Sequence, residues 1–165
     1  MEEYDVIVVG AGPAGSMAAR DAARGGASVL LIERKKEIGA PVRCGEGIGG
    51  HWMHEFGMKI NEKAVSAHIH GSLIVAPNLK DTIRVKTPET KGVVVDRKVF
   101  DKDLALEAGR AGAKIIVKSE VVQVKKKGSK VTGVVVENEG KKEEFSSNVL
   151  IACDGGESTI ARMAG

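Results

Sequence analysis

A glycine-rich turn between an apolar run and an alanine-rich run most strongly constrains how this chain can fold. The turn is Gly10-Ala11-Gly12-Pro13-Ala14-Gly15, which has the pattern GxGxxG. The run before it, EYDVIVVG (3–10), is typical of a parallel strand buried on both faces, and PAGSMAARDAARGG (13–26) is typical of a helix. A strand that leads through GxGxxG into a helix predicts a dinucleotide-binding βαβ unit.

Each glycine of the pattern has a role in such a unit. Gly10 permits the tight turn, Gly12 lets the backbone approach a pyrophosphate, and Gly15 lets helix and strand pack closely. The N-terminus of the helix that begins near Pro13 supplies amide donors and the positive end of the helix dipole. The alternative is a plain βαβ unit in which the glycines serve packing alone.

An acidic residue closes the next apolar run, ASVLLIE (27–33). Glu33 follows Gly15 by 18 residues and is expected to accept hydrogen bonds from the hydroxyls of an adenosine ribose. A carboxylate at this position disfavours a 2′-phosphate, so the site is predicted to hold FAD or NAD rather than NADP. The neighbouring Arg34 is included in the candidate site.

The composition is that of a globular chain and excludes several classes of protein. Of the 165 residues, 42% are apolar and 28% are charged, which suits one domain with a hydrophobic core. No apolar stretch approaches the roughly 20 residues of a membrane span, and no signal peptide is visible, so we expect a cytoplasmic chain. With a net charge of +3 and 3% aromatic residues, no nucleic-acid partner is expected.

Further strands and helices are expected around one long irregular segment. Residues 34–50 show little periodicity, which indicates a functional or flexible loop. A short helix is expected at 51–56, strands at 67–76, 81–86 and 92–97, and a helix at 97–113. Short strands are expected within 114–155, and a helix within 156–165 with Ser158 or Thr159 as its N-cap.

The segment PVRCGEGIGG (41–50) is the most unusual part of the loop. It sets Arg43 and Cys44 among four glycines. Because glycines let a backbone approach a ligand and a nearby cation favours the thiolate, we expect a buried, reactive thiol, with an inert core thiol as the alternative. The other cysteine, Cys153, is too distant in sequence for a CxxC redox pair or a zinc site, and both cysteines are expected to be reduced.

Four segments in order resemble the N-terminal half of the geranylgeranyl reductase family of flavoproteins, with archaeal digeranylgeranylglycerophospholipid reductases as the nearest relatives. They are GAGPAG with Glu33, PVRCGEG, DRKVFDKDLA (96–105) and IACDGGESTIARMAG (151–165). The resemblance implies FAD as the bound cofactor. It also implies an α/β fold: a Rossmann-like, three-layer FAD/NAD(P)-binding domain with a parallel sheet, of the p-hydroxybenzoate hydroxylase type. Residues 1–165 would be the N-terminal portion of this domain, with about 60–95 adding strands to an incomplete β-rich substrate domain.

The same resemblance assigns roles to individual residues. It implies that Ala14 and Gly15 lie on the pyrophosphate, and that Arg43, Cys44, Gly45 and Gly47 line FAD between the pyrophosphate and the isoalloxazine. Arg97 would reach the phosphate or ribityl region, and Asp154 would approach FAD from the last strand. The candidate cofactor-binding residues are Gly10, Gly12, Pro13, Ala14, Gly15, Glu33, Arg34, Arg43, Cys44, Gly45, Gly47, Arg97, Val121, Val122 and Asp154, of which Val121 or Val122 would contact the adenine through main-chain atoms.

Some of these residues have structural alternatives. For Arg97 the alternative is a cap at a strand end or an ion pair with Asp101, and for Asp154 it is a cap on the following helix. Cys153 stands where the wider group usually has alanine, and we interpret it as a small buried hydrophobic residue.

The four histidines are the remaining candidates for metal ligands. His51 and His54 share helical spacing, and His68 and His70 are expected to share one face of a strand. Neither pair has a carboxylate or thiol at a suitable spacing, so surface histidines are favoured and no metal is expected.

The resemblance implies reduction of isolated C=C bonds in the geranylgeranyl chains of membrane lipid precursors. Hydride would come from reduced FAD and a proton would reach the other alkene carbon, with Cys44, or secondarily Glu46, near that event. NADPH, NADH or a reduced iron–sulfur protein such as ferredoxin are the candidate electron donors. The expected partner is a geranylgeranylated lipid, with peripheral contact to the membrane left open.

Proteins of this family run well past 165 residues, into a sheet-rich substrate domain and a second flavin-binding segment. We therefore expect a fragment, a split protein or an excised domain, with its own activity left open and with either a C-terminal half or self-association completing it. The alternatives are an aromatic-ring monooxygenase, which PVRCGEG disfavours, and a non-catalytic FAD-binding module that needs a separate partner.

Overall fold

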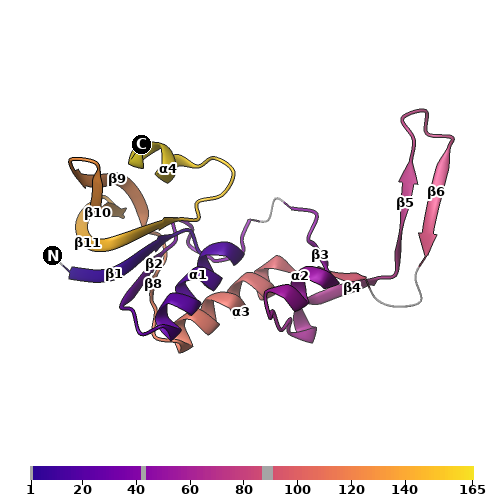
Figure 1. Cartoon of the computed structure of the whole chain (residues 1–165), viewed down its shortest axis with the longest axis horizontal. Helices are drawn as coiled ribbons and strands as arrows, with labels where there is room; N and C mark the ends of the chain where they lie inside the picture. Colours follow the sequence, from indigo (N-terminus) through magenta and orange to yellow (C-terminus); the bar gives the residue numbers. More distant parts are fainter. Residues whose placement is uncertain (1, 42–43, 87–90) are drawn as a thin grey trace. The chain divides into compact units, whose positions relative to one another are not determined.

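The computed structural model describes residues 2–41, 44–86 and 91–165 (Figure 1). The chain divides into two compact units. The first unit contains Met1–Ala40 and Asp101–Gly165, and the second contains Pro41–Phe100.

A six-stranded mixed sheet forms the first unit, in the order β8-β2-β1-β11-β10-β9 (Figure 1). Four strands are parallel: β1 (Glu2–Val9), β2 (Val29–Ile32), β8 (Lys114–Ile116) and β11 (Lys141–Ala152). The strands β9 (Glu120–Lys127) and β10 (Lys130–Asn138) complete an antiparallel meander with β11. The sequence-based prediction of a βαβ unit is confirmed, since α1 (Pro13–Arg24) connects the parallel neighbours β1 and β2.

Both faces of the central strands are covered, which explains their unbroken apolar sequences. Ile7 and Val9 of β1 face a cluster that β9, β10 and the helix α4 (Thr159–Ala164) complete. Val8, between them, faces a second cluster that includes Ala19 of α1 and Ala108 of α3 (Arg97–Arg110). The resulting arrangement is a sheet between two covering layers.

A buried arginine ties the two helices of the second cluster together. Arg20 of α1 is 6% exposed and donates to Glu107 of α3 over 3.0 Å, while its Nε donates to Asp21 over 2.8 Å. These two bonds satisfy a charge that would be costly to bury alone.

Two small sheets form the second unit. One is three-stranded and antiparallel, in the order β3 (Gly47–Gly49), β7 (Gly92–Val95), β4 (Val65–Ile69). The other is a hairpin of β5 (Gly71–Val75) and β6 (Thr82–Lys86). The helix α2 (Gly50–Glu55) and the 3-10 turn η1 (Glu62–Ala64) connect these strands.

Several sequence-based boundaries were wrong. The expected strand 67–76 is two strands in different sheets, β4 and β5, which separate at His70. The expected irregular segment 34–50 contains β3, which pairs with β7. The strands expected to be short within 114–155 include the 12-residue β11. The helices expected at 51–56 and 97–113 are confirmed as α2 and α3.

None of the helices in the described part of the chain has the length and apolar character that a membrane crossing requires.

Candidate functional site

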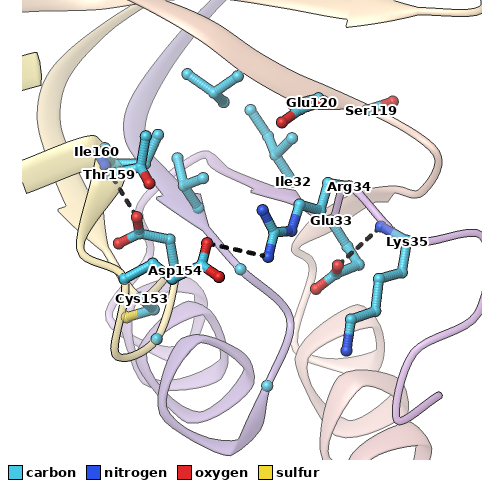
Figure 2. Close-up of a pocket in the computed structure, with 16 residues that line it drawn as sticks. Ile32, Glu33, Arg34, Lys35, Ser119, Glu120, Cys153, Asp154, Thr159 and Ile160 are labelled. Atoms are coloured by element: carbon cyan, nitrogen blue, oxygen red, sulfur yellow. Dashed lines mark hydrogen bonds and ion pairs between the residues drawn. The ribbon is translucent and has the colours of Figure 1, made fainter. Parts of the chain in front are cut away.

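A cavity of about 260 Å³ opens where the parallel strands β1, β2 and β11 end (Figure 2). Carboxyl ends of parallel strands are the usual binding edge of such sheets. All the lining residues belong to the first unit: Val9, Gly10, Gly12, Ile32, Glu33, Arg34, Lys35, Ser119, Glu120, Val121, Cys153, Asp154, Gly155, Glu157, Thr159 and Ile160.

The turn from β1 into α1 needs glycine at two positions for packing. Gly10 has φ +100°, and a Cβ there would lie 2.3 Å from the carbonyl oxygen of Cys153. A Cβ on Gly15 would lie 1.8 Å from the carbonyl oxygen of Gly10. The turn is therefore held close to both the end of β11 and the first turn of α1.

Gly12 differs from Gly10 and Gly15, because within the described part of the chain no atom beyond its sequence neighbours lies within 4 Å of the position its Cβ would take. Its φ of −72° is accessible to any residue. Neither packing nor backbone strain therefore requires glycine at this position. Because Gly12 has no side chain, open space remains beside the start of α1.

The first turn of α1 begins beside that space, although Pro13, Ala14 and Gly15 are not themselves among the residues that line the cavity. Gly12 is the N-cap residue without a side-chain cap, and Pro13 has no amide hydrogen. The amides of Ala14 and Gly15 lie in the first turn, where a helix offers no carbonyl acceptor. No acidic residue occupies this turn. The helix end therefore has the donors and dipole that bind an anion.

Glu33 holds the glycine turn from the side of β2. Its side chain is 8% exposed, and Oε2 accepts a hydrogen bond from the amide of Ala11 over 2.9 Å. Its Oε1 accepts from the amide of Lys35, also over 2.9 Å (Figure 2). Each carboxylate oxygen has a second lone pair, so both oxygens retain the capacity to accept from a ribose hydroxyl. Sequence reasoning identified Glu33 but missed its bond to Ala11.

The segment before β9 forms the opposite wall of the cavity. The amide of Ser119 donates to the carbonyl of Glu33 over 3.0 Å, which joins this wall to the end of β2. Val121 lines the cavity and is buried, whereas Val122 is not part of the lining. Sequence reasoning did not select Ser119, because no motif marks it.

A long ion pair and a helix cap lie near the mouth. The guanidinium of Arg34 lies 3.7 Å from the carboxylate of Glu157 (Figure 2). Oδ2 of Asp154 accepts from the amide of Ile160 over 2.9 Å, so Asp154 caps α4. The expected Ser158 or Thr159 cap is wrong: Ser158 is the N-cap residue, but it has φ 49° and makes no side-chain cap bond.

Cys153 lies between the turn and the sheet. It is partly buried and packs against the cluster beneath α1. Burial raises the pKa of its thiol above the ordinary value of 9.0, and the negative charge of Asp154 raises the pKa further. The thiol is therefore held protonated at neutral pH.

The cysteine of the 41–50 loop has a different setting from the one expected. Cys44 is exposed, so the prediction of a buried thiol is wrong. Its sulfur accepts from the amide of Glu46 over 3.4 Å, and Glu46 has φ 60°. Among the described residues, no atom beyond their sequence neighbours lies within 4 Å of the Cβ positions of Gly45 and Gly47. Arg43 lies outside the described residues.

Arg97 begins α3 and, like Cys44, Gly45 and Gly47, belongs to the second unit. The predicted contacts of these residues with FAD remain predictions. Of the histidines, His51 lies 3.0 Å from the carboxylate of Glu55, one helical turn along α2. His70 lies after the end of β4, so it does not share a strand face with His68.

The profile of a family described as FAD dependent oxidoreductase matches residues 5–165 of the sequence. The chain belongs to the FAD dependent oxidoreductase family. The predicted FAD cofactor class and Rossmann-like fold class are thereby confirmed.

Curated relatives of this FAD dependent oxidoreductase include reductases of two archaea. The chain is 46% identical over 163 residues to digeranylgeranylglycerophospholipid reductase of Methanococcus aeolicus. The aligned residues are 99% of this chain and 41% of that protein. It is 42% identical over 165 residues to the protein of the same name from Picrophilus torridus, covering 98% and 42%. The predicted resemblance is confirmed, and the chain spans about two fifths of the length of these relatives.

Solved structures show the same fold. A geranylgeranyl bacteriochlorophyll reductase-like protein from Thermoplasma acidophilum has a TM-score of 0.94 at 40% identity, covering 100% of this chain and 42% of that one. The flavin-dependent brominase Bmp2 has a TM-score of 0.80 at 24% identity, which is a likeness of fold alone.

Proposed function

We propose that the cavity at the ends of β1, β2 and β11 binds the adenosine diphosphate part of FAD. We further propose that the chain is the N-terminal, FAD-binding part of an enzyme that reduces C=C bonds in the geranylgeranyl chains of membrane lipid precursors. The observation that carries the proposal is the open space over Gly12, which is the N-cap residue of α1 and lies with the carboxylate of Glu33 in the lining of one cavity.

The cavity has the size and the donor set for part of a dinucleotide. Ligand pockets usually measure roughly 300–1,000 Å³, so about 260 Å³ suits the adenosine and pyrophosphate better than the whole of FAD. In this assignment the amides of Ala14 and Gly15 donate to the pyrophosphate. Glu33 accepts from the ribose hydroxyls while it also holds the amide of Ala11.

Other cavity residues have supporting roles in the proposal. The main chain at Val121 contacts the adenine, and Val121 is preferred over Val122 because only Val121 lines the cavity. Asp154 acts through α4, whose first turn it caps at the cavity wall. Arg34 closes the mouth together with Glu157.

The second unit would supply the flavin contacts and the substrate side. We assign Arg43, Cys44, Gly45, Gly47 and Arg97 to the flavin, as the resemblance implies. The strands β4 to β7 would be the beginning of a substrate domain, since they form sheets separate from that of the first unit. The hairpin β5–β6 within them exposes apolar side chains, as an incomplete domain would.

FAD supplies hydride transfer when it is reduced and bound. What this chain contributes is binding, orientation and a candidate thiol. Cys44 is exposed and stands among glycines with open space beside them, so a substrate can approach it. It is the proposed catalytic residue, with Glu46 as the second candidate. The carboxylate of Glu33 selects only the dinucleotide that stays bound, so it does not restrict the electron donor. NADPH, NADH and reduced ferredoxin are each suitable donors for reducing the flavin again.

The relatives' printed names motivate the substrate: they are digeranylgeranylglycerophospholipid reductases. A substrate of this kind lies in a membrane, so we propose peripheral contact of the complete enzyme with a lipid surface. The likeness to a brominase is one of fold alone and supports no halogenation or hydroxylation.

The test is an assay of a protein that carries residues 1–165 within the full length of such relatives. It is supplied with FAD, a reductant and digeranylgeranylglycerophospholipid, and the lipid is then analysed by mass spectrometry. We expect the mass to rise by two hydrogens for each reduced bond, and Cys44→Ser to slow this turnover. Unchanged lipid in the presence of bound, reduced flavin would contradict the proposed reaction. Full turnover by Cys44→Ser would remove only Cys44 from it.

A further inference from the structure

The short link that connects β8 to β9 joins two walls of the cavity. The amide of Lys118 donates to the carbonyl of Lys35 over 2.9 Å, and the amide of Ser119 donates to the carbonyl of Glu33 over 3.0 Å. Val121, whose main chain is proposed to contact the adenine, follows two residues later and lines the cavity. The link therefore sets how far the wall at Val121 lies from Glu33.

Lys118 holds the link in a conformation that a residue with a side chain adopts only at a cost in free energy. Its φ of 53° lies in the left-handed region, where the Cβ approaches the backbone closely. Such a backbone persists where surrounding contacts hold it, and it is frequent at binding sites. The contacts that hold the link in this shape therefore bear on the cavity.

A buried hydroxyl provides one of these contacts. Ser119 is 2% exposed, and its Oγ donates to the carbonyl of Val117 over 2.9 Å. Nδ2 of Asn138 donates to the same Oγ over 3.2 Å. A hydroxyl has one hydrogen and the carbonyl of Val117 can only accept, so the group that Asn138 presents to Ser119 has to be a donor.

Asn138 reaches the link from outside the cavity. It is the last residue of β10 and is not among the residues that line the cavity. The next residue, Glu139, makes a second contact, in which Nζ of Lys118 lies 3.2 Å from its carboxylate. Both side chains of this ion pair are exposed, and exposed pairs contribute little to stability. The bond from Asn138 to the buried hydroxyl is therefore the stronger constraint on the link.

The strand that follows the link is irregular beside the cavity. In β9, Val121 pairs with Val136 and Gln123 pairs with Val135, so Val122 is an extra residue in the ladder. Such a bulge bends its strand, and bulges are frequent next to active sites. Because the ladder is interrupted at this point, pairing with β10 does not by itself fix the main chain at Val121, and the link supplies a second constraint.

We propose that Asn138 is a positioning residue for the adenosine end of the cavity. Its bond to Ser119 holds the link, and the link holds the carbonyl of Glu33 and the main chain at Val121 at the separation that ribose and adenine need. Because this role assumes that the cavity binds adenosine, it rests on the proposed function. The pyrophosphate end has a different support, since Gly10 packs against the end of β11. Loss of the Asn138 bond should therefore weaken contacts to adenosine more than contacts to pyrophosphate.

Competition with FAD on the purified chain separates the two ends, with ADP and inorganic pyrophosphate as the competing ligands. Asn138→Ala should weaken ADP binding about fivefold, the equivalent of one hydrogen bond, and should change pyrophosphate affinity by less than about twofold. Glu139→Ala is the matched control in the same turn, and it should bind both ligands as the parent does. Gly12→Ala should weaken both ligands, which shows that the assay reports on the pyrophosphate end.

Two further measurements separate positioning from a general loss of stability. When Ser119→Ala is already present, Asn138→Ala should weaken ADP binding no further, because the two residues act through one bond. Hydrogen exchange at the amide of Ser119 should be faster in Asn138→Ala than in Glu139→Ala, since only the first change releases the link.

Two results would overturn the positioning role while the proposed cofactor site stands. Equal losses of ADP and pyrophosphate affinity in Asn138→Ala would show a structural role, and unchanged ADP affinity would show no role. A parent chain that binds neither ligand would overturn the proposed function together with the positioning role.

Discussion

Alanine at Gly15 and at Gly12 should separate the packing role of the glycine turn from its cofactor role. A Cβ on Gly15 would lie 1.8 Å from the carbonyl oxygen of Gly10 and 3.1 Å from Cβ of Cys153. The amide of Gly10 donates to the carbonyl of Ile32 over 2.7 Å, and this bond fixes the backbone at Gly10. The carbonyl of Gly10 therefore cannot move away from the added Cβ without a large cost in free energy. The helix and the sheet would have to separate.

The magnitude follows from two opposing effects. Overpacking costs about 1–3 kcal/mol, and a rigid backbone contact puts this case at the upper end. Replacing glycine by alanine within a helix stabilises the helix by about 1 kcal/mol. Gly15→Ala should therefore lower the free energy of unfolding by about 2 kcal/mol.

Gly12→Ala should behave in the opposite way. Its Cβ would meet no atom of the described residues within 4 Å apart from its sequence neighbours, so the free energy of unfolding should change by less than about 0.5 kcal/mol. The methyl group would occupy the space proposed for the pyrophosphate. We expect FAD affinity to fall by at least about tenfold, or about 1.4 kcal/mol.

The assay combines urea unfolding of the cofactor-free chains with titration by FAD fluorescence. An unfolding midpoint of Gly15→Ala equal to that of the parent would refute the packing argument. Undiminished FAD binding by Gly12→Ala would refute the placement of the pyrophosphate.

Four further predictions concern Glu33, Asp154 and the two cysteines. Glu33→Ala leaves the buried amide of Ala11 without an acceptor and should cost about 1–3 kcal/mol in urea unfolding, whereas Glu33→Gln, which keeps one acceptor oxygen, should cost less. Asp154→Ala should cost about 0.5–2 kcal/mol and speed hydrogen exchange at Ile160, while Ser158→Ala, which removes no cap, should change neither. Iodoacetamide at pH 8 should modify exposed Cys44 before Cys153, as peptide mapping can show. Because the pKa of Cys153 is raised on folding, its protonated thiol contributes stability below pH 9.0 that is lost as the pH rises through the raised pKa, and Cys153→Ala should abolish this loss.

The parts of the fold that the sequence predicted well depend on local patterns. Gly10 to Gly15 lie between a buried strand and a helix, and each of these elements has its own periodicity. The position of Glu33 follows from the length of one βαβ unit. These features need no knowledge of distant contacts, which explains their agreement with the structure.

The features that sequence reasoning missed depend on tertiary contacts. The break between β4 and β5 arises where the chain changes sheets, and at Gly71 a Cβ would lie 2.1 Å from the carbonyl oxygen of Val85. The pattern of apolar residues continues across this break, so the sequence alone does not indicate that the strand ends there. The exposure of Cys44 likewise depends on how its loop folds, which neighbouring glycines do not determine.

The sequence around the start of α4 predicts the wrong capping residue. Ser158 precedes an apolar run in the usual way, but its left-handed backbone keeps the hydroxyl from capping. Asp154 reaches the amide of Ile160 from six residues upstream, through a turn that includes Gly155 at φ +84°. Asp154 therefore positions a wall of the cavity, a role that the motif alone left as an alternative.

The most direct test of the account is competition between FAD and ADP for the purified chain, followed by flavin fluorescence. The account predicts that FAD binds with one site per chain, that ADP displaces it, and that Gly12→Ala weakens both ligands together. Binding of FAD that ADP fails to displace would place the cofactor elsewhere. If neither ligand binds at concentrations up to about 1 mM, the binding free energy is weaker than about 4 kcal/mol. This result would contradict the assignment of the cavity to FAD.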